Sequence, residues 1–243
     1  MPSLLMVLTA ATRWSQKDGT QRPTGFWAEE FVEPHRVFTA AGVDLTIASP
    51  GGRRPVVDEG SLTARANGGD EKKAADLRAY LEEVKDLLDA PERLEDIDPA
   101  AYDGVFIPGG HGPMQDLAVN EDVARILAAL LPDPSKAVAS LCHGPASFLA
   151  AGDAEGNWLF KGRRMTSFTD EEETLTGRAA NAPWLLEERL RAAGALHEPG
   201  PAWSSHVVVD GNLVTGQNPQ SAAEAARAVL DMLAERAGKP SGA

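Results

Sequence analysis

This sequence is organised around Ala137-Val138-Ala139-Ser140-Leu141-Cys142-His143-Gly144-Pro145-Ala146, the stretch that contains its only cysteine. The first five residues are apolar or small and uncharged, which is typical of a buried strand. Gly144 and Pro145 then predict a tight turn and the first turn of a helix. Cys142 is therefore expected at the carboxyl edge of a sheet, beside the free N–H groups of a helix N-terminus, which stabilise a thiolate.

The spacing Ser140-x-Cys142-x-Gly144 is the cysteine form of the nucleophile elbow, with serine in place of the first glycine. His143 follows directly and could act as a base. A lone cysteine is most often a small buried hydrophobic residue. Here the strand, turn and helix signals coincide with an adjacent histidine, so we interpret Cys142 as a nucleophile.

The composition indicates the class of protein and excludes several partners. A chain of 243 residues can form one large α/β domain, and its single cysteine excludes an intramolecular disulfide and fits a reducing compartment. The net charge of −13, without any basic run, argues against nucleic acid or an anionic membrane as the main partner. The apolar residues 3–11 lack a basic leader and suit a buried strand, and no run approaches the length of a membrane span. We expect a soluble cytoplasmic protein.

Strand and helix signals alternate along the chain. Expected strands are 4–10, 43–49, 102–108, 137–141 and 163–168, followed by a β-hairpin over 203–216 with Asp210-Gly211-Asn212 at its turn. Expected helices are one ending at Ala41 and those at 71–90, 120–131, 146–151, 184–193 and 219–237, with a frayed tail from Lys239. Residues 12–24, 53–70 and the acidic run from Asp170 are expected to be loops. This alternation predicts a mostly parallel sheet with helices on both faces and ligands at its carboxyl edge.

Three motifs carry a resemblance to a known superfamily: 139–145 (Ala-Ser-Leu-Cys-His-Gly-Pro), 106–112 (Phe-Ile-Pro-Gly-Gly-His-Gly) and 25–30 (Gly-Phe-Trp-Ala-Glu-Glu). Together they resemble the DJ-1/ThiJ/PfpI superfamily, and more closely its longer branch of glyoxalase III enzymes and heat-inducible chaperones. Further matches lie at 166–173, 182–187 and 215–219. The resemblance covers nearly the whole chain. It implies a flavodoxin-like three-layer sandwich, with residues 1–243 forming one class I glutamine amidotransferase-like domain and 71–100 a charged helical insertion.

The resemblance also implies roles for the residues near the elbow. Cys142 would be the nucleophile, His143 its neighbouring acid or base, and Glu30 the carboxylate that approaches the thiol. A third acid orients the histidine in this branch. Glu173 occupies that place, and Asp170 is a competitor. On sequence alone, Glu30 reads as an ordinary exposed carboxylate of a helix, and Glu173 as part of a solvated loop.

The remaining expected site features lie after the strand 102–108. By resemblance, Gly110 lends a backbone N–H to an oxyanion site, while His111 either packs or contacts substrate. No metal or organic cofactor is expected. The five histidines contain no His-x-x-x-His pair of the kind that binds zinc.

The favoured reaction is conversion of methylglyoxal or a similar 2-oxoaldehyde to the 2-hydroxy acid, D-lactate, without glutathione, through a hemithioacetal on Cys142. A stress-related holding chaperone and a protein deglycase are alternatives, and a redox-sensing role is also open. Glutamine amidotransfer is disfavoured, because the late His206 is followed by two valines instead of a His-x-Glu pair. The expected partner is a small dicarbonyl, with no nucleic acid or membrane and with a possible homodimer.

Overall fold

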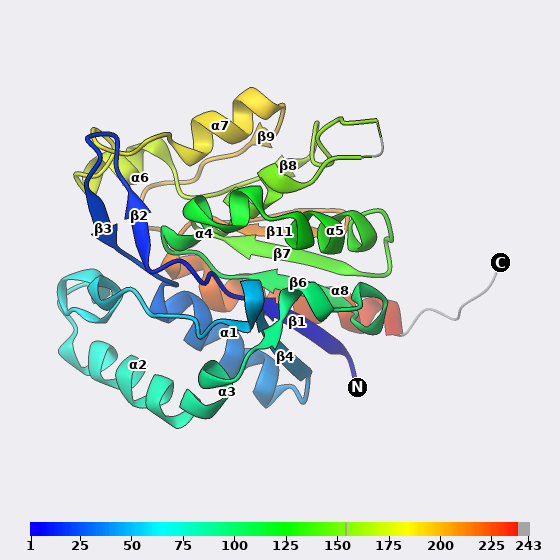
Figure 1. Ribbon diagram of the computed structural model, residues 1–243. Helices are drawn as coiled ribbons and strands as arrows, with labels where there is room; N and C mark the ends of the chain where they lie inside the picture. The colour runs from blue at the N-terminus through cyan, green and yellow to red at the C-terminus, as the bar shows by residue number, and fades with distance from the viewer. Residues whose placement is uncertain (154, 238–243) are drawn as a thin grey trace.

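A seven-stranded sheet forms the centre of the protein, in the order β10-β11-β7-β6-β1-β4-β5 (Figure 1). The computed structural model describes residues 1–153 and 155–237, so the expected tail from Lys239 lies outside the described residues. The strands are β1 (Ser3–Val7), β4 (Asp44–Ser49), β5 (Glu92–Arg93), β6 (Gly104–Ile107), β7 (Ala137–Leu141), β10 (Val207–Asp210) and β11 (Leu213–Gly216). Neighbouring strands run parallel except for the hairpin β10–β11. The predicted mostly parallel sheet is confirmed.

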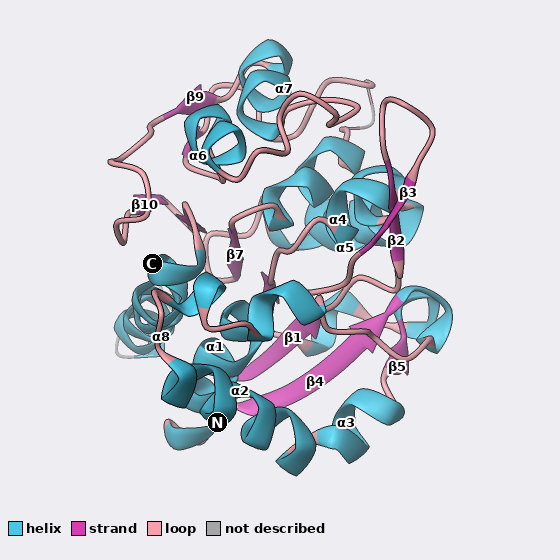
Figure 2. Ribbon diagram, turned by 90° about the vertical axis from the view of Figure 1, so that its left-hand side faces the viewer, coloured by secondary structure: helices cyan, strands magenta, loops and turns pink. Residues whose placement is uncertain are grey.

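Helices cover both faces of this sheet. They are α1 (Ala28–Ala40), α2 (Glu71–Glu83), α3 (Lys85–Asp89), α4 (Gly112–Gln115), α5 (Glu121–Leu130), α6 (Asp170–Leu175), α7 (Leu186–Ala193) and α8 (Ala222–Ala237). Figure 2 shows β1 and β4 side by side; α1 packs against β4, and α2 packs against α1. None of the helices in the described part of the chain is both long and apolar enough to cross a lipid bilayer.

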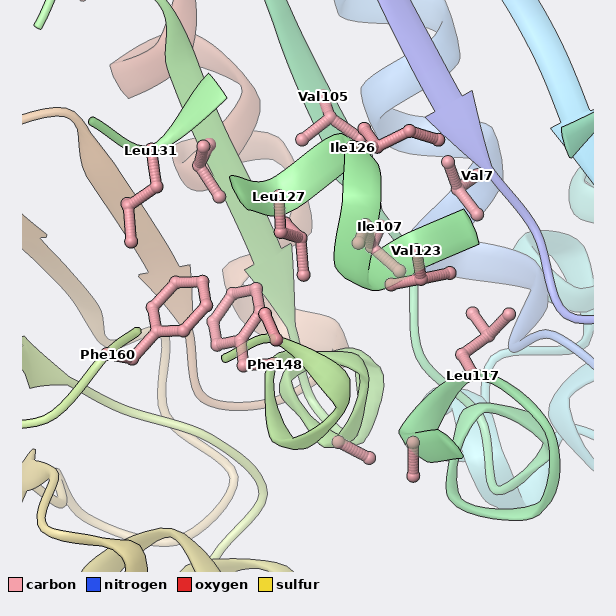
Figure 3. Packing of buried hydrophobic residues seen from close by; sticks show 14 of the residues in the cluster. Val7, Val105, Ile107, Leu117, Val123, Ile126, Leu127, Leu131, Phe148 and Phe160 are labelled. Atoms are coloured by element: carbon pink, nitrogen blue, oxygen red, sulfur yellow. The ribbon is translucent and has the colours of Figure 1, made fainter. Parts of the chain in front are cut away.

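Successive side chains of the central strands belong alternately to two separate apolar clusters, one on each face of the sheet. Leu4 and Met6 of β1 join the cluster under α1 and α8, whereas Leu5 and Val7 join the cluster under α5. Figure 3 shows part of the second cluster, where side chains of β6 meet those of α5. Because successive strand residues point to opposite faces, a sheet that is apolar throughout must be covered on both sides. The fold is the expected flavodoxin-like three-layer sandwich.

The register of the central strands brings the segments that follow β6 and β7 together. Gly104 pairs with Ala137 and Ile107 with Ser140, so the two strands end nearly level. β1 lies on the other side of β6 in the same direction. The loop 108–111 and the residues from Cys142 onward therefore leave the sheet at one edge, as the sequence predicts.

Two expected elements between the main strands are wrong. Residues 12–24 were expected to be a loop, yet they form an antiparallel pair, β2 (Arg13–Ser15) and β3 (Gln21–Pro23). These strands carry polar residues and lack the alternation that predicts a strand, and buried Trp14 anchors them. The expected strand 163–168 is reduced to β8 (Arg164–Met165), which pairs with β9 (Leu196–His197) outside the main sheet.

The expected helix 71–90 breaks into two. The chain departs from helical geometry at Val84, where φ is −98° and ψ is 15°, and α3 begins at the next residue. Leu77, Val84 and Leu88 are buried in the same cluster as α1. This charged segment therefore covers the sheet's helical layer, as its amphipathic pattern indicates.

Candidate active site

Cys142 lies at the corner where β7 ends and a 3-10 helix (η7, Gly144–Ala150) begins in place of the expected α-helix. Its φ is +57°, the left-handed region that non-glycine residues rarely adopt. Its amide N–H donates to the Gly216 carbonyl at 2.9 Å, and its own carbonyl accepts from the Phe168 amide at 2.9 Å. A side chain at Gly144 would collide with the Ser140 hydroxyl and a neighbouring backbone carbonyl. The corner is therefore fixed by backbone bonds on both sides and by glycine.

A chain of polar contacts runs from the sulfur to two histidines. Cys142 Sγ lies 3.4 Å from His143 Nδ1, and His143 Nε2 lies 2.6 Å from Glu173 Oε2. The other Glu173 oxygen lies 3.0 Å from His111 Nε2. An ionised carboxylate only accepts hydrogen bonds, so both Nε2 atoms carry hydrogen. In its neutral form, His143 then presents Nδ1 to the sulfur as a hydrogen-bond acceptor.

The charges of this buried chain are set by its neighbours. Burial would raise the pKa of Glu173, but the adjacent His111 and His143 outweigh it and hold that pKa far below its ordinary value. Burial first, and the neighbouring His143 second, lower the pKa of His111 to about 3. Glu173 is therefore ionised and His111 neutral at pH 7. His111, which the sequence left between packing and substrate contact, is a buried partner of Glu173.

Glu173 reaches the histidines because the expected acidic loop at 170–173 is a helix, α6. Its N-terminus has a capping box, in which the Thr169 hydroxyl accepts from the Glu172 amide at 3.1 Å and the Glu172 carboxylate accepts from the Thr169 amide at 3.1 Å. The Thr-x-x-Glu spacing was present in the sequence and was overlooked. Asp170 lies elsewhere: its amide donates to Glu187 at 3.1 Å, and burial followed by the charge of Glu187 raises the pKa of its carboxyl.

This difference between the two acids gives a direct test. In Glu173→Gln the amide has one acceptor oxygen, so one histidine loses its partner and the tautomer of His143 is no longer fixed. We expect kcat for a reaction at Cys142 to fall by about 100-fold or more, with KM changing little. Asp170→Asn is the matched control and should retain activity. Equal losses in both variants would contradict the assignment of Glu173 as the positioning residue.

Glu30, in the first turn of α1, approaches the sulfur from another side. Its Oε2 accepts from the Gly109 amide at 2.7 Å, and its buried Oε1 has no hydrogen-bond partner among the described residues. The carboxyl lies close enough to the Cys142 thiol for each group to shift the pKa of the other. Burial raises the pKa of Glu30 to about 8. Burial first, and the charge of Glu30 second, raise the pKa of the Cys142 thiol well above its ordinary value. The expected thiolate stabilised by a helix N-terminus is therefore wrong: burial and a neighbouring acid dominate.

Gly110 contributes a backbone donor beside the sulfur. Its N–H lies near enough to the sulfur to counteract part of the rise in the thiol pKa. Its φ is +91°, and a Cβ there would lie 2.8 Å from the Trp27 amide nitrogen. Only glycine allows the loop to approach α1 this closely. The role of this N–H as a donor to a developing oxyanion stays a prediction.

Aromatic rings enclose these groups. Four ring pairs form a continuous stack, with centroid separations of 4.2 Å for Trp14–His111, 4.1 Å for His111–His143, 4.5 Å for His143–Phe168 and 5.6 Å for Phe168–Trp203. The rings of His111, His143, Phe168 and Trp203 border a chamber of about 30 Å³ that also reaches Cys142. Trp203 has a φ of +61°, so among the described residues it and Cys142 are the two non-glycine residues with positive φ.

The comparison with family models decides the chain's classification. The model of the DJ-1/PfpI family matches residues 23–232. The chain belongs to the DJ-1/PfpI family. Among DJ-1/PfpI relatives, glyoxalase 3 of Candida albicans is 30% identical over 236 residues, covering 95% of this chain and 98% of that protein. The glutathione-independent glyoxalase HSP31 of Saccharomyces cerevisiae is 31% identical over 242 residues, covering 95% and 97%. The crystal structure of glyoxalase III from Candida albicans superposes with a TM-score of 0.78 at 28% identity, covering 95% and 97%.

One part of this DJ-1/PfpI site has the donor types of a metal centre. The ligand atoms of His111, His143 and Glu173 lie within 4.8 Å of one another, and all three residues are buried. Two histidines and a carboxylate are a common ligand set for zinc. Here the carboxylate is occupied by hydrogen bonds to both imidazoles. The absence of a metal from the working enzyme stays a prediction.

Several residues of the DJ-1/PfpI site were not singled out in the sequence. Trp14 and Trp203 lie far from the elbow in the chain, Trp14 in a segment expected to be a loop and Trp203 at the start of the expected hairpin. Arg178 also borders the chamber, with its Nε buried and without a hydrogen-bond partner among the described residues. A tryptophan or arginine outside a motif carries no local signal of its role. Only the fold brings these three to Cys142.

Proposed function

We propose that this DJ-1/PfpI enzyme converts methylglyoxal, or a similar 2-oxoaldehyde, to the 2-hydroxy acid without glutathione or a cofactor. The observation that carries the proposal is the pair of proton-transferring groups around one sulfur. His143 Nδ1 lies 3.4 Å from Cys142 Sγ, and the buried Glu30 carboxyl lies beside the same thiol, close enough to shift its pKa. Moving a hydrogen between neighbouring carbons requires both an acid and a base at the bound substrate. The two glyoxalase relatives support the same reaction.

In the first step the thiol adds to the aldehyde carbon. Because the pKa of the thiol is raised, a base must take its proton during attack, and the unprotonated Nδ1 of His143 is in place to do so. The C–S bond forms as the C=O double bond opens, and the Gly110 N–H stabilises the negative oxygen. Return of the proton from His143 to this oxygen gives the hemithioacetal.

The second step moves a hydrogen from the aldehyde carbon to the neighbouring ketone carbon. His143 removes the proton from the carbon bound to sulfur, while Glu30, protonated below a pKa of about 8, protonates the ketone oxygen to give an enediol. His143 then returns its proton to the former ketone carbon, while the hydroxyl on the sulfur-bearing carbon gives its proton to Glu30 and becomes the carbonyl of the 2-hydroxy acid thioester. Water then cleaves the C–S bond and restores the thiol. The sum is addition of one water to the 2-oxoaldehyde, without an external oxidant or reductant.

Incubation with methylglyoxal in the absence of glutathione tests the proposal. We expect D-lactate to accumulate at a rate proportional to the protein concentration and in an amount equal to the methylglyoxal consumed. Protein whose single thiol has been alkylated with iodoacetamide serves as the control and should form none. Consumption of methylglyoxal without lactate would reject the reaction, because it would indicate simple trapping by surface amines.

The alternative roles make different demands on Cys142. A holding chaperone needs an apolar surface, so suppression of client aggregation would survive alkylation of the thiol. Deglycation of proteins would require the thiol, but lysine hemiaminals would then be consumed faster than free methylglyoxal. Running both assays beside the lactate measurement separates the three roles.

A further inference from the structure

The small chamber at Cys142 opens into a larger cavity. The chamber of about 30 Å³ shares Trp27, Thr176, Arg178, Trp203 and Pro219 with an outer cavity of about 590 Å³. A water needs roughly 10–15 Å³ of such space, so the chamber admits only the reacting end of a substrate. Cavities of several hundred Å³ hold molecules far larger than a three-carbon dicarbonyl. The site is therefore built for a substrate with a body beyond its reacting carbons.

The outer cavity is lined by three arginines and by no acidic residue. Arg22 comes from β3, Arg65 from the segment before α2, and Arg178 from the segment after α6. None of them forms an ion pair within residues 1–153 and 155–237. The chain as a whole carries a net charge of −13. The outer cavity is therefore positively charged, although the chain as a whole is negatively charged.

Arg178 links this charge to the reacting group. It is half-buried, its Nε is fully enclosed without a hydrogen-bond partner, and it borders both the chamber and the outer cavity. Burial first, and the like charge of Arg22 second, lower the pKa of Arg178. The charges of Glu173 and Asp58 act on Arg178 in the opposite direction, but neither acid forms an ion pair with it among the described residues. A bound anion would stabilise the two arginines that repel one another.

The two acidic residues beside this cavity are already engaged. The Asp58 carboxylate accepts from the Gly60 amide at 2.8 Å, and Asp58 is buried. Glu59 forms an ion pair with Arg78 at 3.2 Å. Neither of them lines the outer cavity. The arginines therefore face a cavity whose own lining contains no carboxylate.

We propose that the substrate is an anionic 2-oxoaldehyde, whose carboxylate or phosphate is bound by Arg22, Arg65 and Arg178 while its aldehyde reaches Cys142. This inference rests on the proposed function for the reacting end and extends it to the other end. Guanidinium groups bind both kinds of anion through paired N–H donors. The aromatic walls formed by Trp27 and Trp203 suit the carbon chain between the two ends.

The first experiment needs no turnover. Iodoacetate and iodoacetamide differ by one charge at similar size, and both alkylate the single thiol. We expect the iodoacetate-to-iodoacetamide rate ratio at Cys142 to exceed that of 2-mercaptoethanol by about fivefold and to fall with ionic strength. Each of the variants R22Q, R65Q and R178Q should lower this rate ratio by about two- to fivefold. R65Q removes an exposed side chain, so the test holds even if R178Q folds poorly.

The matched control is R227Q, which removes the same charge from an exposed position on α8 and should leave the ratio unchanged. The second experiment compares kcat/KM for 4,5-dioxopentanoate, 3-phosphooxy-2-oxopropanal and methyl 4,5-dioxopentanoate. We expect the acids to exceed the ester by about tenfold or more, and the faster acid identifies the anion. In R65Q this preference should shrink.

The outcomes separate the two proposals. An alkylation ratio equal to that of 2-mercaptoethanol and unmoved by the arginine variants overturns the anion site, even if methylglyoxal gives lactate. A ratio that follows the arginines, with no 2-oxoaldehyde turned over, retains the anion site and rejects the glyoxalase reaction. An ester converted as fast as the acids overturns the inferred substrate class.

Discussion

Replacing Cys142 by alanine should lower kcat/KM for lactate formation from methylglyoxal by at least about 1,000-fold. Without the sulfur no hemithioacetal forms, and the imidazole and carboxyl alone have no covalent intermediate on which to act. Alanine keeps a Cβ and the same backbone conformation, so the thermal unfolding temperature should change little. D-lactate measured at equal protein concentration checks the first statement, and a thermal melt checks the second.

A histidine control sharpens that experiment. His206 is the residue that an amidotransferase-type arrangement would use, yet its Nε2 lies 3.0 Å from the Glu198 carbonyl oxygen, a backbone contact within its own region. His206→Gln should therefore retain lactate formation, whereas His143→Gln should lose it. Lactate from the Cys142→Ala protein at the native rate would mean that another group is the nucleophile. If His206→Gln lost lactate formation while His143→Gln retained it, the assignment of His143 as the base would be contradicted.

Glu30→Gln should stabilise the protein at alkaline pH. It should also remove part of the pH dependence of the free energy of unfolding. The pKa of Glu30 is raised from 4.5 to about 8 in the folded protein. Between these values the folded chain must hold a proton that the unfolded chain releases, so the free energy of unfolding falls as pH rises. The loss amounts to roughly 3–5 kcal/mol across this window. Glutamine keeps an oxygen for the Gly109 amide and carries no charge to bury.

Urea unfolding of native protein and Glu30→Gln at pH 5 and pH 8 measures this effect. The stability difference between the two proteins should be small at pH 5 and should favour the variant at pH 8. The thiol supplies a second readout, because the charge of Glu30 contributes to its raised pKa. The pH midpoint of iodoacetamide reactivity should therefore move downward in the variant. Unchanged stability and an unchanged midpoint would together contradict a buried, proton-holding Glu30.

The sequence predicted those parts of the fold that depend on local pattern. The apolar runs around Leu5, Phe106 and Val138 are buried strands, and Asn120 caps the helix that the sequence placed there, accepting from the Val123 amide at 2.9 Å. Such signals arise from burial of neighbouring residues and from helix termini, which a short window contains. Convergence of the elbow and the Gly109-Gly110 loop followed from parallel topology alone.

The details of the site depended on contacts between distant segments. Whether Glu173 or Asp170 reaches the histidine is decided by α6, whose capping box was the overlooked signal. The thiol pKa could not be foreseen, because the sequence shows a helix start after Cys142 but not the depth of burial or the position of Glu30. The arginines of the outer cavity come from three segments with no common pattern. Long-range packing fixed each of these outcomes.

The left-handed backbone at Cys142 and Trp203 bears on how the protein can evolve. A residue with a Cβ in this conformation costs about 1–2 kcal/mol relative to glycine, and both of these residues border the same chamber. Selection for heat resistance alone would favour glycine at both positions and would erase the nucleophile and one aromatic wall. At these two positions of the chamber, a substitution that stabilises the fold would therefore remove a group that the proposed reaction needs.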